Sequence, residues 1–283
     1  MSSAVLACID GSVYTSTVAD HAAWAAKRLG APVELLKVLG RREVSSSDRS
    51  GRIVPAARRQ LLEELAAVDA ERAKLLHRQG WLDLEEAEAR IEEAGVGEVT
   101  PLLRHGDLLE TLTEREAGAQ LLVIGKRGEA ADFAKLHLGS NLERIVRASH
   151  RPILIATRTY RPIHRVLIAF DGRSSALKAV DEVSRSPLYA GMTCEVLYAG
   201  TPNDETRRKL DGAVSQLQGG GLQAEMRIEA GEPVKVIGGA VEEGGDQMLV
   251  MGAYGHSRLR SLVIGSTTTE LLRTCRLAIM IYR

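Results

Sequence analysis

The sequence predicts an α/β fold in which two doubly wound domains, each built on a five-stranded parallel sheet, follow one another along the chain. The chain has 283 residues, about twice the size of a common domain. Short apolar runs alternate with amphipathic helical segments, which is typical of parallel sheets covered on both faces. The sequence also repeats itself in the same order, in four pairs of similar segments: 4–12 and 165–175, 121–128 and 248–255, 138–149 and 264–275, and 152–157 and 277–282.

The repeat places the domains at residues 1–160 and 161–283, with a boundary where Pro and Arg interrupt the apolar pattern. The two copies differ in length. Asp10 and Gly125 are 115 residues apart, whereas the matching Asp171 and Gly252 are 81 residues apart, so the first domain is longer by 34 residues. These additional residues form an insertion in the first domain.

The insertion, at about 55–95, is rich in Ala, Leu and charged residues with helical periodicity. Gly80 interrupts this pattern, and Asp83 with Glu86 three residues later matches a capping box at the start of a second helix. We therefore expect a helical hairpin, with no residues in it that suggest chemistry.

The expected strands occupy matching positions in the two halves: 4–9, 33–39, 98–104, 120–124 and 153–157 in the first, and 165–170, 193–199, 222–228, 247–251 and 278–282 in the second. Helices connect them, and the third helix of each half is expected to open at Asp107 or at Glu232-Pro233. The fifth strands are apolar and would promote aggregation as exposed edges. We expect them to pair about a pseudo-twofold axis, so that one chain forms an intramolecular pseudo-dimer.

Composition excludes several classes of function. Lys plus Arg and Asp plus Glu both number 37, and aromatic residues make up only 4%, so neither a nucleic-acid nor a membrane partner is expected. The three cysteines are far apart and no histidine cluster matches a zinc motif, which predicts a reducing environment and no zinc site. The N-terminus lacks the features of a signal peptide, and we expect a cytoplasmic protein.

The second half carries the motif that suggests chemistry. Gly252 is followed after two residues by Gly255, and nine residues later by Gly265 and Ser266. Glycines allow backbone N–H groups to approach an anion closely, and the start of the helix that follows favours phosphate. Asp171 ends the first strand at the same edge of the sheet, where it is placed to accept hydrogen bonds from a ribose or a base or to help hold a metal.

This Gly-x2-Gly-x9-Gly-Ser pattern, paired with an Asp-Gly turn after the first strand, resembles the ATP-binding pattern of the universal stress protein family. The tandem arrangement is similar to that of its two-domain members, and the resemblance covers the chain except for the insertion. It implies the adenine-nucleotide α-hydrolase-like fold, ATP as ligand with or without Mg²⁺, a contact through the fifth strands, and a regulatory role in stress with an unknown protein partner. A further homodimer would use other surfaces.

Residue by residue, the resemblance implies a nucleotide site in each half. The second-half site comprises Asp171, Met251, Gly252, Gly255, Gly265, Ser266 and Thr267. The first-half site comprises Asp10, Ile124, Gly125, Gly128, Gly139, Ser140 and Asn141. The resemblance assigns no metal ligands.

The first half departs from the pattern, because ten residues instead of nine separate Gly128 from Gly139. Its loop contains two carboxylates, at Glu129 and Asp132, that would repel a triphosphate. Its cations would attract one: Lys126, Arg127 and His137. One inserted residue misdirects backbone donors, so we expect the second site to be the stronger.

Purely structural interpretations of the same residues also remain open. Helix capping alone explains the Ser or Thr and Glu pairs at Ser140–Glu143 and Thr267–Glu270. The glycines also fit simple turns, and Asp10 and Asp171 fit Asx turns. Three functions compete: a regulatory ATP-binding protein, a slow ATPase or adenylyl-transferring enzyme, and a nucleotide-free scaffold. The sequence around the second-half loop offers no clear carboxylate except Asp171, which favours binding over fast turnover.

Overall fold

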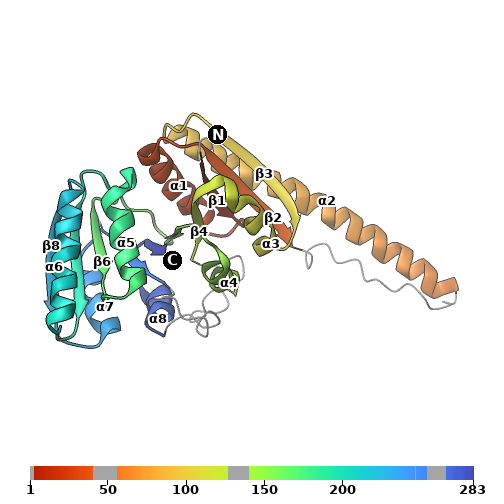
Figure 1. Ribbon diagram of the computed structural model, residues 1–283. Coiled ribbons are helices and arrows are strands. Elements are labelled where there is room, and N and C mark those ends of the chain that lie inside the picture. The colour runs from red at the N-terminus through yellow and green to blue at the C-terminus, as the bar shows by residue number, and fades with distance from the viewer. Residues whose placement is uncertain (1–2, 41–55, 127–139, 246, 254–265) are drawn as a thin grey trace.

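The computed structural model describes residues 3–40, 56–126, 140–245, 247–253 and 266–283 (Figure 1). The first half contains these elements in order: β1 Ala4–Ile9, α1 Thr15–Leu29, β2 Val33–Gly40, α2 Ala56–Glu93, β3 Val99–Gly106, α3 Leu108–Arg115, η1 Glu116–Gly118, β4 Ala119–Gly125, α4 Ser140–Ala148 and β5 Ile153–Ala156.

The second half repeats the order with one short helix moved: β6 Arg165–Ala169, α5 Ser174–Arg185, η3 Pro187–Tyr189, β7 Thr193–Ala199, α6 Asp204–Gly219, β8 Gln223–Glu229, α7 Pro233–Glu243, β9 Gln247–Gly252, α8 Ser266–Thr274 and β10 Ile279–Tyr282. The predicted helix starts are confirmed at both places. Asp107 caps α3 by accepting hydrogen bonds from the N–H groups of Leu109 and Glu110, and Pro233 opens α7 after Glu232.

The strands form one continuous sheet in the order β3-β2-β1-β4-β5-β10-β9-β6-β7-β8. Neighbours within each half are parallel, which confirms the predicted five-stranded sheets. The halves meet through β5 and β10, which pair antiparallel with Ile155 opposite Ile279 and Leu154 opposite Met280. The predicted pairing of the fifth strands is therefore confirmed, and the carboxyl ends of the two sets of strands lie at opposite edges of the sheet.

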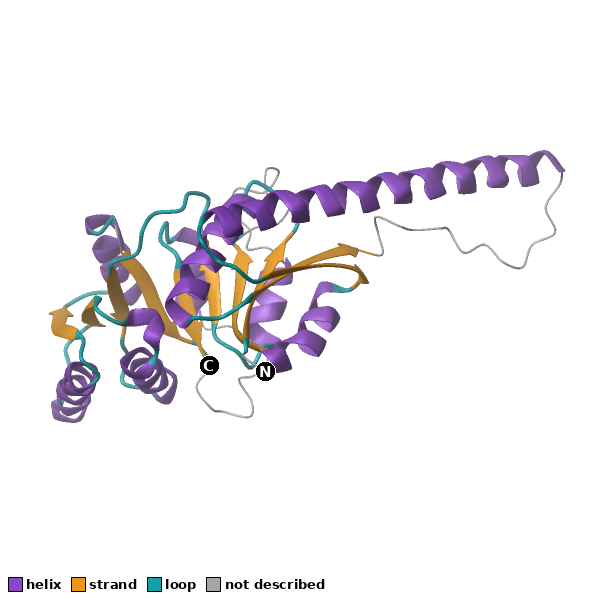
Figure 2. Ribbon diagram, turned by 90° about the horizontal axis from the view of Figure 1, so that it is seen from above, coloured by secondary structure: helices purple, strands orange, loops and turns teal. Residues whose placement is uncertain are grey.

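Helices cover both faces of this sheet (Figure 2). Alternate strand residues such as Val5 and Ala7 belong to the layer that includes α1, α2, α5 and α6, whereas Leu6 and Cys8 belong to the layer that includes α3, α4, α7 and α8. Each layer contains residues from both halves. The two repeats therefore share their core instead of folding around separate ones.

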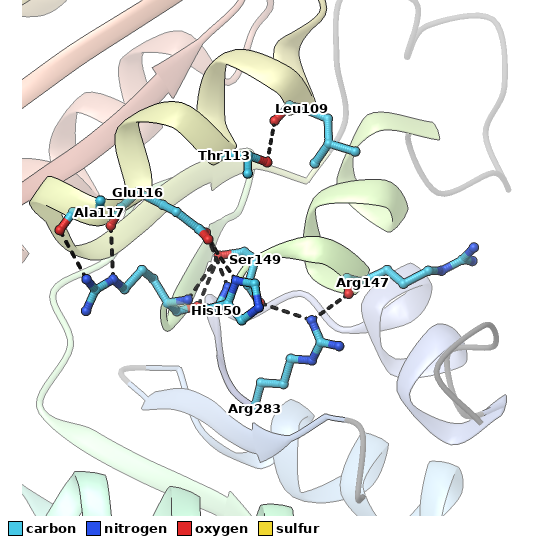
Figure 3. Close-up of polar contacts among 9 residues, drawn as sticks. Leu109, Thr113, Glu116, Ala117, Arg147, Ser149, His150 and Arg283 are labelled. Carbon is cyan, nitrogen blue, oxygen red and sulfur yellow. Dashed lines mark hydrogen bonds and ion pairs between the residues drawn. The ribbon is translucent and has the colours of Figure 1, made fainter. Parts of the chain in front are cut away.

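A cation from each half binds carbonyl oxygens at the carboxyl end of a helix in the other half. Arg283, after β10, donates hydrogen bonds to the carbonyl oxygens of Arg147 (2.6 Å) and Ser149 (3.2 Å) at the end of α4 (Figure 3). In the opposite direction, Lys126 follows β4 and donates to the carbonyl oxygen of Cys275 just after α8. A cation at the carboxyl end of a helix compensates its dipole and satisfies carbonyls that lack helical partners.

A buried carboxylate fixes the turn between α4 and β5. Glu116 accepts hydrogen bonds from the Ser149 hydroxyl (2.9 Å), the backbone N–H of His150 (3.2 Å) and its ring Nδ1 (2.9 Å), and Arg151 donates to the carbonyl oxygens of Glu116 and Ala117 (Figure 3). Burial would raise the pKa of Glu116, but the hydrogen bonds from His150 and Ser149 hold it below its usual value. This network positions the start of β5, on which the pairing with β10 depends.

The expected helical hairpin is wrong. The insertion forms one helix, α2, which runs through Gly80 without a break. Gly80 is buried, and a Cβ atom there would lie 2.9 Å from Leu103 Cδ1 and 3.6 Å from Leu39 Cδ2. The glycine therefore allows the helix to approach β2 and β3 closely, and Asp83 pairs with Lys37 instead of capping a new helix.

His21 on α1 is almost completely buried. Its Nδ1 lies 2.6 Å from the carbonyl oxygen of Thr17, and its ring meets that of Tyr160 edge-on at 5.0 Å. Burial lowers the pKa of His21, although the Thr17 carbonyl and Asp20 act in the opposite direction. The folded protein therefore favours the neutral imidazole of His21.

A lowered pKa in the folded state means that this part of the stability is complete above the unfolded value of about 6.5 and is lost as the pH falls below it. We expect the free energy of unfolding to fall between pH 7.5 and pH 5.5 by less in His21→Phe than in the wild type, the difference being at most about 1.4 kcal/mol per pH unit. Urea unfolding of both proteins at the two pH values measures this. Identical losses would contradict the assignment.

Candidate functional site

The second half presents an exposed carboxylate at the carboxyl edge of its sheet. Asp171 follows β6, and Gly172 next to it has a φ of 73°. Asp171 Oδ1 accepts a hydrogen bond from the N–H of Arg173 (3.0 Å), which confirms an Asx turn, yet 54% of its side chain remains exposed. The Arg173 guanidinium lies 3.6 Å from its other oxygen. The turn holds the carboxylate in place without enclosing it.

The end of the neighbouring strand is closely packed. β6 and β9 are adjacent and parallel, with Ala169 opposite Met251, so Gly252 at the end of β9 and Asp171 just after β6 lie at the same edge of the sheet. Met251 is buried. A Cβ atom on Gly252 would lie 2.4 Å from the backbone carbon of Ser175 at the start of α5. The fold itself therefore requires glycine at this position.

α8 begins at the same edge, because it connects β9 to the parallel strand β10 and must return from the carboxyl ends. Ser266, its first residue, is exposed and Thr267 is half-buried, so the start of this nine-residue helix is accessible. The Glu270 carboxylate binds Arg273, which gives it a partner other than a capping hydrogen bond. Gly255 and Gly265 lie outside the described residues.

The first half repeats the turn after its first strand. Asp10 Oδ1 accepts a hydrogen bond from the N–H of Ser12 (3.0 Å), and Gly11 between them has a φ of 83°. The N–H of Gly11 donates to the Thr15 hydroxyl (3.1 Å). The matching backbone geometry shows that the two Asp-Gly turns are structural equivalents.

The surroundings of this first turn differ, because α2 lies against it. Asp83 of α2 pairs with Lys37 of β2, and a Cβ atom on Gly11 would lie 2.7 Å from Asp83 Oδ2 and 2.9 Å from Lys37 Nζ. Residues of α1, α2 and the turn enclose a cavity of about 150 Å³, lined by Gly11, Ser12, Val13, Thr15, Ser16, Asp83, Glu86, Ala87 and Arg90. Two carboxylates of the insertion therefore face the first-half edge.

Sequence reasoning missed this ion pair, although Lys37 offered a signal. It is the one charged residue among the last six residues of the strand Val33–Gly40, and it is buried. A buried lysine requires a partner, because an unpaired charge is costly in the protein interior. The partner lies 46 residues away, where local spacing gives no indication of it.

The remaining residues of the first-half site are only partly described. Ile124 is buried and Gly125 half-buried at the end of β4, next to β1. Ser140 begins α4 and Asn141 is exposed. Gly128 and Gly139 lie outside the described residues, as do the carboxylates and two of the cations of that loop. The third cation, Lys126, is buried and donates to Cys275, so it contributes to the contact between the halves.

Comparison with known proteins bears on the identity of this fold. The model of the universal stress protein family matches residues 1–157 and 196–283. The chain belongs to the universal stress protein family. A relative in this family, universal stress protein Slr1230 of Synechocystis, is 33% identical over 99% of both chains, so the tandem length is common to the two.

Solved structures of family members share the fold over the whole chain. A universal stress protein of Archaeoglobus fulgidus superimposes with a TM-score of 0.72 at 21% identity, covering 100% of this chain and 99% of the other. A putative universal stress protein of Pseudomonas aeruginosa gives a TM-score of 0.62 at 19% identity, covering 99% of this chain and 93% of the other. At this identity the likeness establishes the fold.

Other kinds of site receive no support from the described residues. Within them, no group of three or more His, Cys, Asp and Glu side chains is arranged to hold a metal ion. The three cysteines are free and buried, and burial raises the pKa of each thiol, to about 12 for Cys194. Of the helices described, none is both long and apolar enough to cross a membrane.

The close approach at Gly252 can be separated from any role in binding. We expect Gly252→Ala to lower the free energy of unfolding by about 1–3 kcal/mol, because the added methyl would overlap the backbone at Ser175. Gly212 in the middle of α6 has no atom within 4 Å of a Cβ position, so Gly212→Ala should instead stabilise the protein by about 0.5–1 kcal/mol. Denaturant unfolding of both variants tests this. A neutral Gly252→Ala would show that the strand end has room for a side chain.

Proposed function

We propose that this universal stress protein is a cytoplasmic regulatory protein of the stress response that binds ATP at the carboxyl edge of its second half. One observation carries the proposal: the exposed carboxylate of Asp171 and the accessible start of α8 belong to the same edge of the sheet. In this proposed site Met251 and Gly252 are the last residues of β9, next to Asp171. The residues proposed for the phosphate side are Gly255, Gly265, Ser266 and Thr267.

The chemistry of these residues fits a nucleotide. The N–H groups and dipole at the start of α8 favour phosphate oxygens, and the hydroxyls of Ser266 and Thr267 add donors. Asp171 is an acceptor for ribose or base hydroxyl and amino groups. Bound Mg²⁺ would neutralise phosphate charge and take most of its ligands from phosphate and water, so it needs few protein groups.

The first half is the weaker site in this proposal. Asp10 holds the same turn as Asp171, but Asp83 and Glu86 of α2 line the cavity beside it. Carboxylates at this position repel a triphosphate, and the nearby Lys37 already pairs with Asp83. This reason is independent of the extra residue in the first-half loop.

Binding without rapid turnover is the favoured activity. Phosphoryl transfer requires a group that orients the attacking nucleophile and a cation that stabilises the transferring phosphoryl. At the described part of the second-half edge, Asp171 already accepts a hydrogen bond from the Arg173 N–H and lies 3.6 Å from the Arg173 guanidinium. In this proposal Asp171 and Arg173 hold the ligand in position and do not activate a nucleophile. ATP would then act by changing the partner surface of the protein.

Asp171→Ala and Asp10→Ala are matched variants, because each removes the acceptor of an equivalent turn. Loss of one hydrogen bond to a charged group costs about 1.5–3 kcal/mol, so Asp171→Ala should weaken the tighter ATP-binding event by about 10- to 150-fold. Asp10→Ala should leave that event unchanged. Calorimetric titration with ATP and Mg²⁺ measures both.

Three results would contradict the proposal in different ways. Loss of the tighter event in Asp10→Ala alone would reverse the ranking of the sites. No heat and no thermal stabilisation with ATP would favour a nucleotide-free scaffold. Chromatography of the nucleotide after incubation provides the last check, because steady conversion of ATP to ADP or AMP would favour an enzyme.

A further inference from the structure

The helix that opens at the second-half site ends beside the strand ends of the first half. α8 connects β9 to the parallel strand β10, so it begins at the carboxyl edge of its own half and ends at the amino edge. Because β5 and β10 pair antiparallel, that amino edge lies on the same side of the sheet as the carboxyl edge of the first half. The nine residues of α8 span roughly 13 Å at 1.5 Å per residue.

The far end of α8 is bound by a residue of the first half. Lys126 follows Gly125, the last residue of β4, and its backbone N–H donates to the carbonyl oxygen of Ala156 (3.1 Å) at the end of β5. Its side chain reaches into the second half and donates to the carbonyl oxygen of Cys275. The N–H of Cys275 donates to the carbonyl oxygen of Leu271 (2.9 Å), so Cys275 closes the last turn of α8.

This contact lies in the protein interior. Lys126 and Cys275 are both buried, and so are Leu271 and Leu272 on the face of α8 that packs into the shared core. Burial raises the pKa of the Cys275 thiol, and the charge of Lys126 acts in the opposite direction. A hydrogen bond from a charged donor is stronger than a neutral one, and a cation here also compensates the helix dipole. The carboxyl end of α8 is therefore fixed both by packing and by Lys126.

We propose that Lys126 is a positioning residue of the second-half ATP site and acts through α8. This inference rests on the ATP binding proposed above. A helix start binds phosphate only where its first N–H groups point at the ligand, and those of α8 lie at Ser266 and Thr267. By holding the other end of this short helix, Lys126 sets the direction of those N–H groups. The first half thereby supports the second-half site, although Asp83 and Glu86 line the cavity at its own edge.

The reciprocal contact on α4 is more exposed. Arg283 donates to the carbonyl oxygens of Arg147 and Ser149 at the end of α4, which is also a nine-residue helix and begins among the first-half site residues (Figure 3). Arg283 is half-buried, whereas Lys126 is buried. Water competes more effectively for the exposed contact, so α8 is the more firmly held of the two helices. This difference agrees with the proposed ranking of the sites.

Lys126→Met tests the proposal, because methionine keeps an unbranched side chain and removes the charge and the donors. Calorimetric titration with ATP and Mg²⁺ should show the tighter binding event weakened by about 5- to 50-fold. The titration is made at a temperature where circular dichroism shows the variant fully folded, since a loss of global stability alone leaves the affinity unchanged there. Lys126→Gln, which also removes the charge, replaces the methionine variant if that one is unfolded.

Arg28→Met is the matched control. Arg28 of α1 donates to the carbonyl oxygens of Leu188 and Ala190 at η3, so it too is a first-half cation that binds second-half carbonyls. η3 leads into β7 and opens no candidate site. Arg28→Met should lower the melting temperature about as much as Lys126→Met, by about 3–8 °C, and keep the affinity of the tighter event within about twofold of the wild type.

Three outcomes would overturn the role of Lys126 while leaving ATP binding in place. An unchanged tighter event in Lys126→Met would limit the contact to stability. Weakening of the weaker event alone would make Lys126 part of the first-half site. Equal weakening in Lys126→Met and Arg28→Met would assign the effect to a loosened contact between the halves. A wild type that binds no ATP would refute the proposed function itself, and this inference with it.

Discussion

The antiparallel pairing of β5 with β10 is the contact on which the rest of the structure depends. Three residue pairs, from Ile279–Ile155 to Ile281–Ile153, join two five-stranded sheets into one and convert two exposed apolar edges into the centre of a shared core. The same pairing reverses the direction of the second set of strands, so the two candidate sites lie at opposite edges. The halves can therefore evolve different edges while sharing one core.

The insertion in the first half makes its edge different from that of the second half. The C-terminal part of α2 packs on β2 and β3 and directs Asp83 toward Lys37 beside the Asp10 turn. Beside the Asp171 turn, α6 instead places Thr206 and Lys209 near Gly172, so the charged side chain of that helix closest to this turn is a cation and not a carboxylate. The N-terminal part of α2 extends away from the rest of the molecule (Figure 1), with four apolar side chains exposed: Leu61, Leu65, Val68 and Leu75. The insertion therefore makes the two edges of one chain unequal.

The repeated elements could be predicted from sequence, because apolar runs and helix starts depend on neighbouring residues. Strand β1 and the cap at Asp107 lie where their local patterns place them. The insertion could not be predicted in this way. Gly80 has the local signature of a break, but its lack of a side chain allows a close contact with Leu103. The partner of Lys37 lies 46 residues away in the sequence. Such contacts follow from packing between elements, which spacing along the chain does not encode.

The two equivalent turns differ because Asp83 and Glu86 of α2 line the cavity beside the first of them. Amide hydrogen exchange of the full chain, with and without saturating ATP and Mg²⁺, tests this directly by mass spectrometry. We expect added protection in peptides covering residues 170–175 and the start of α8, with little change in peptides covering residues 10–15. Equal protection at both turns, or protection at residues 10–15 alone, would contradict it.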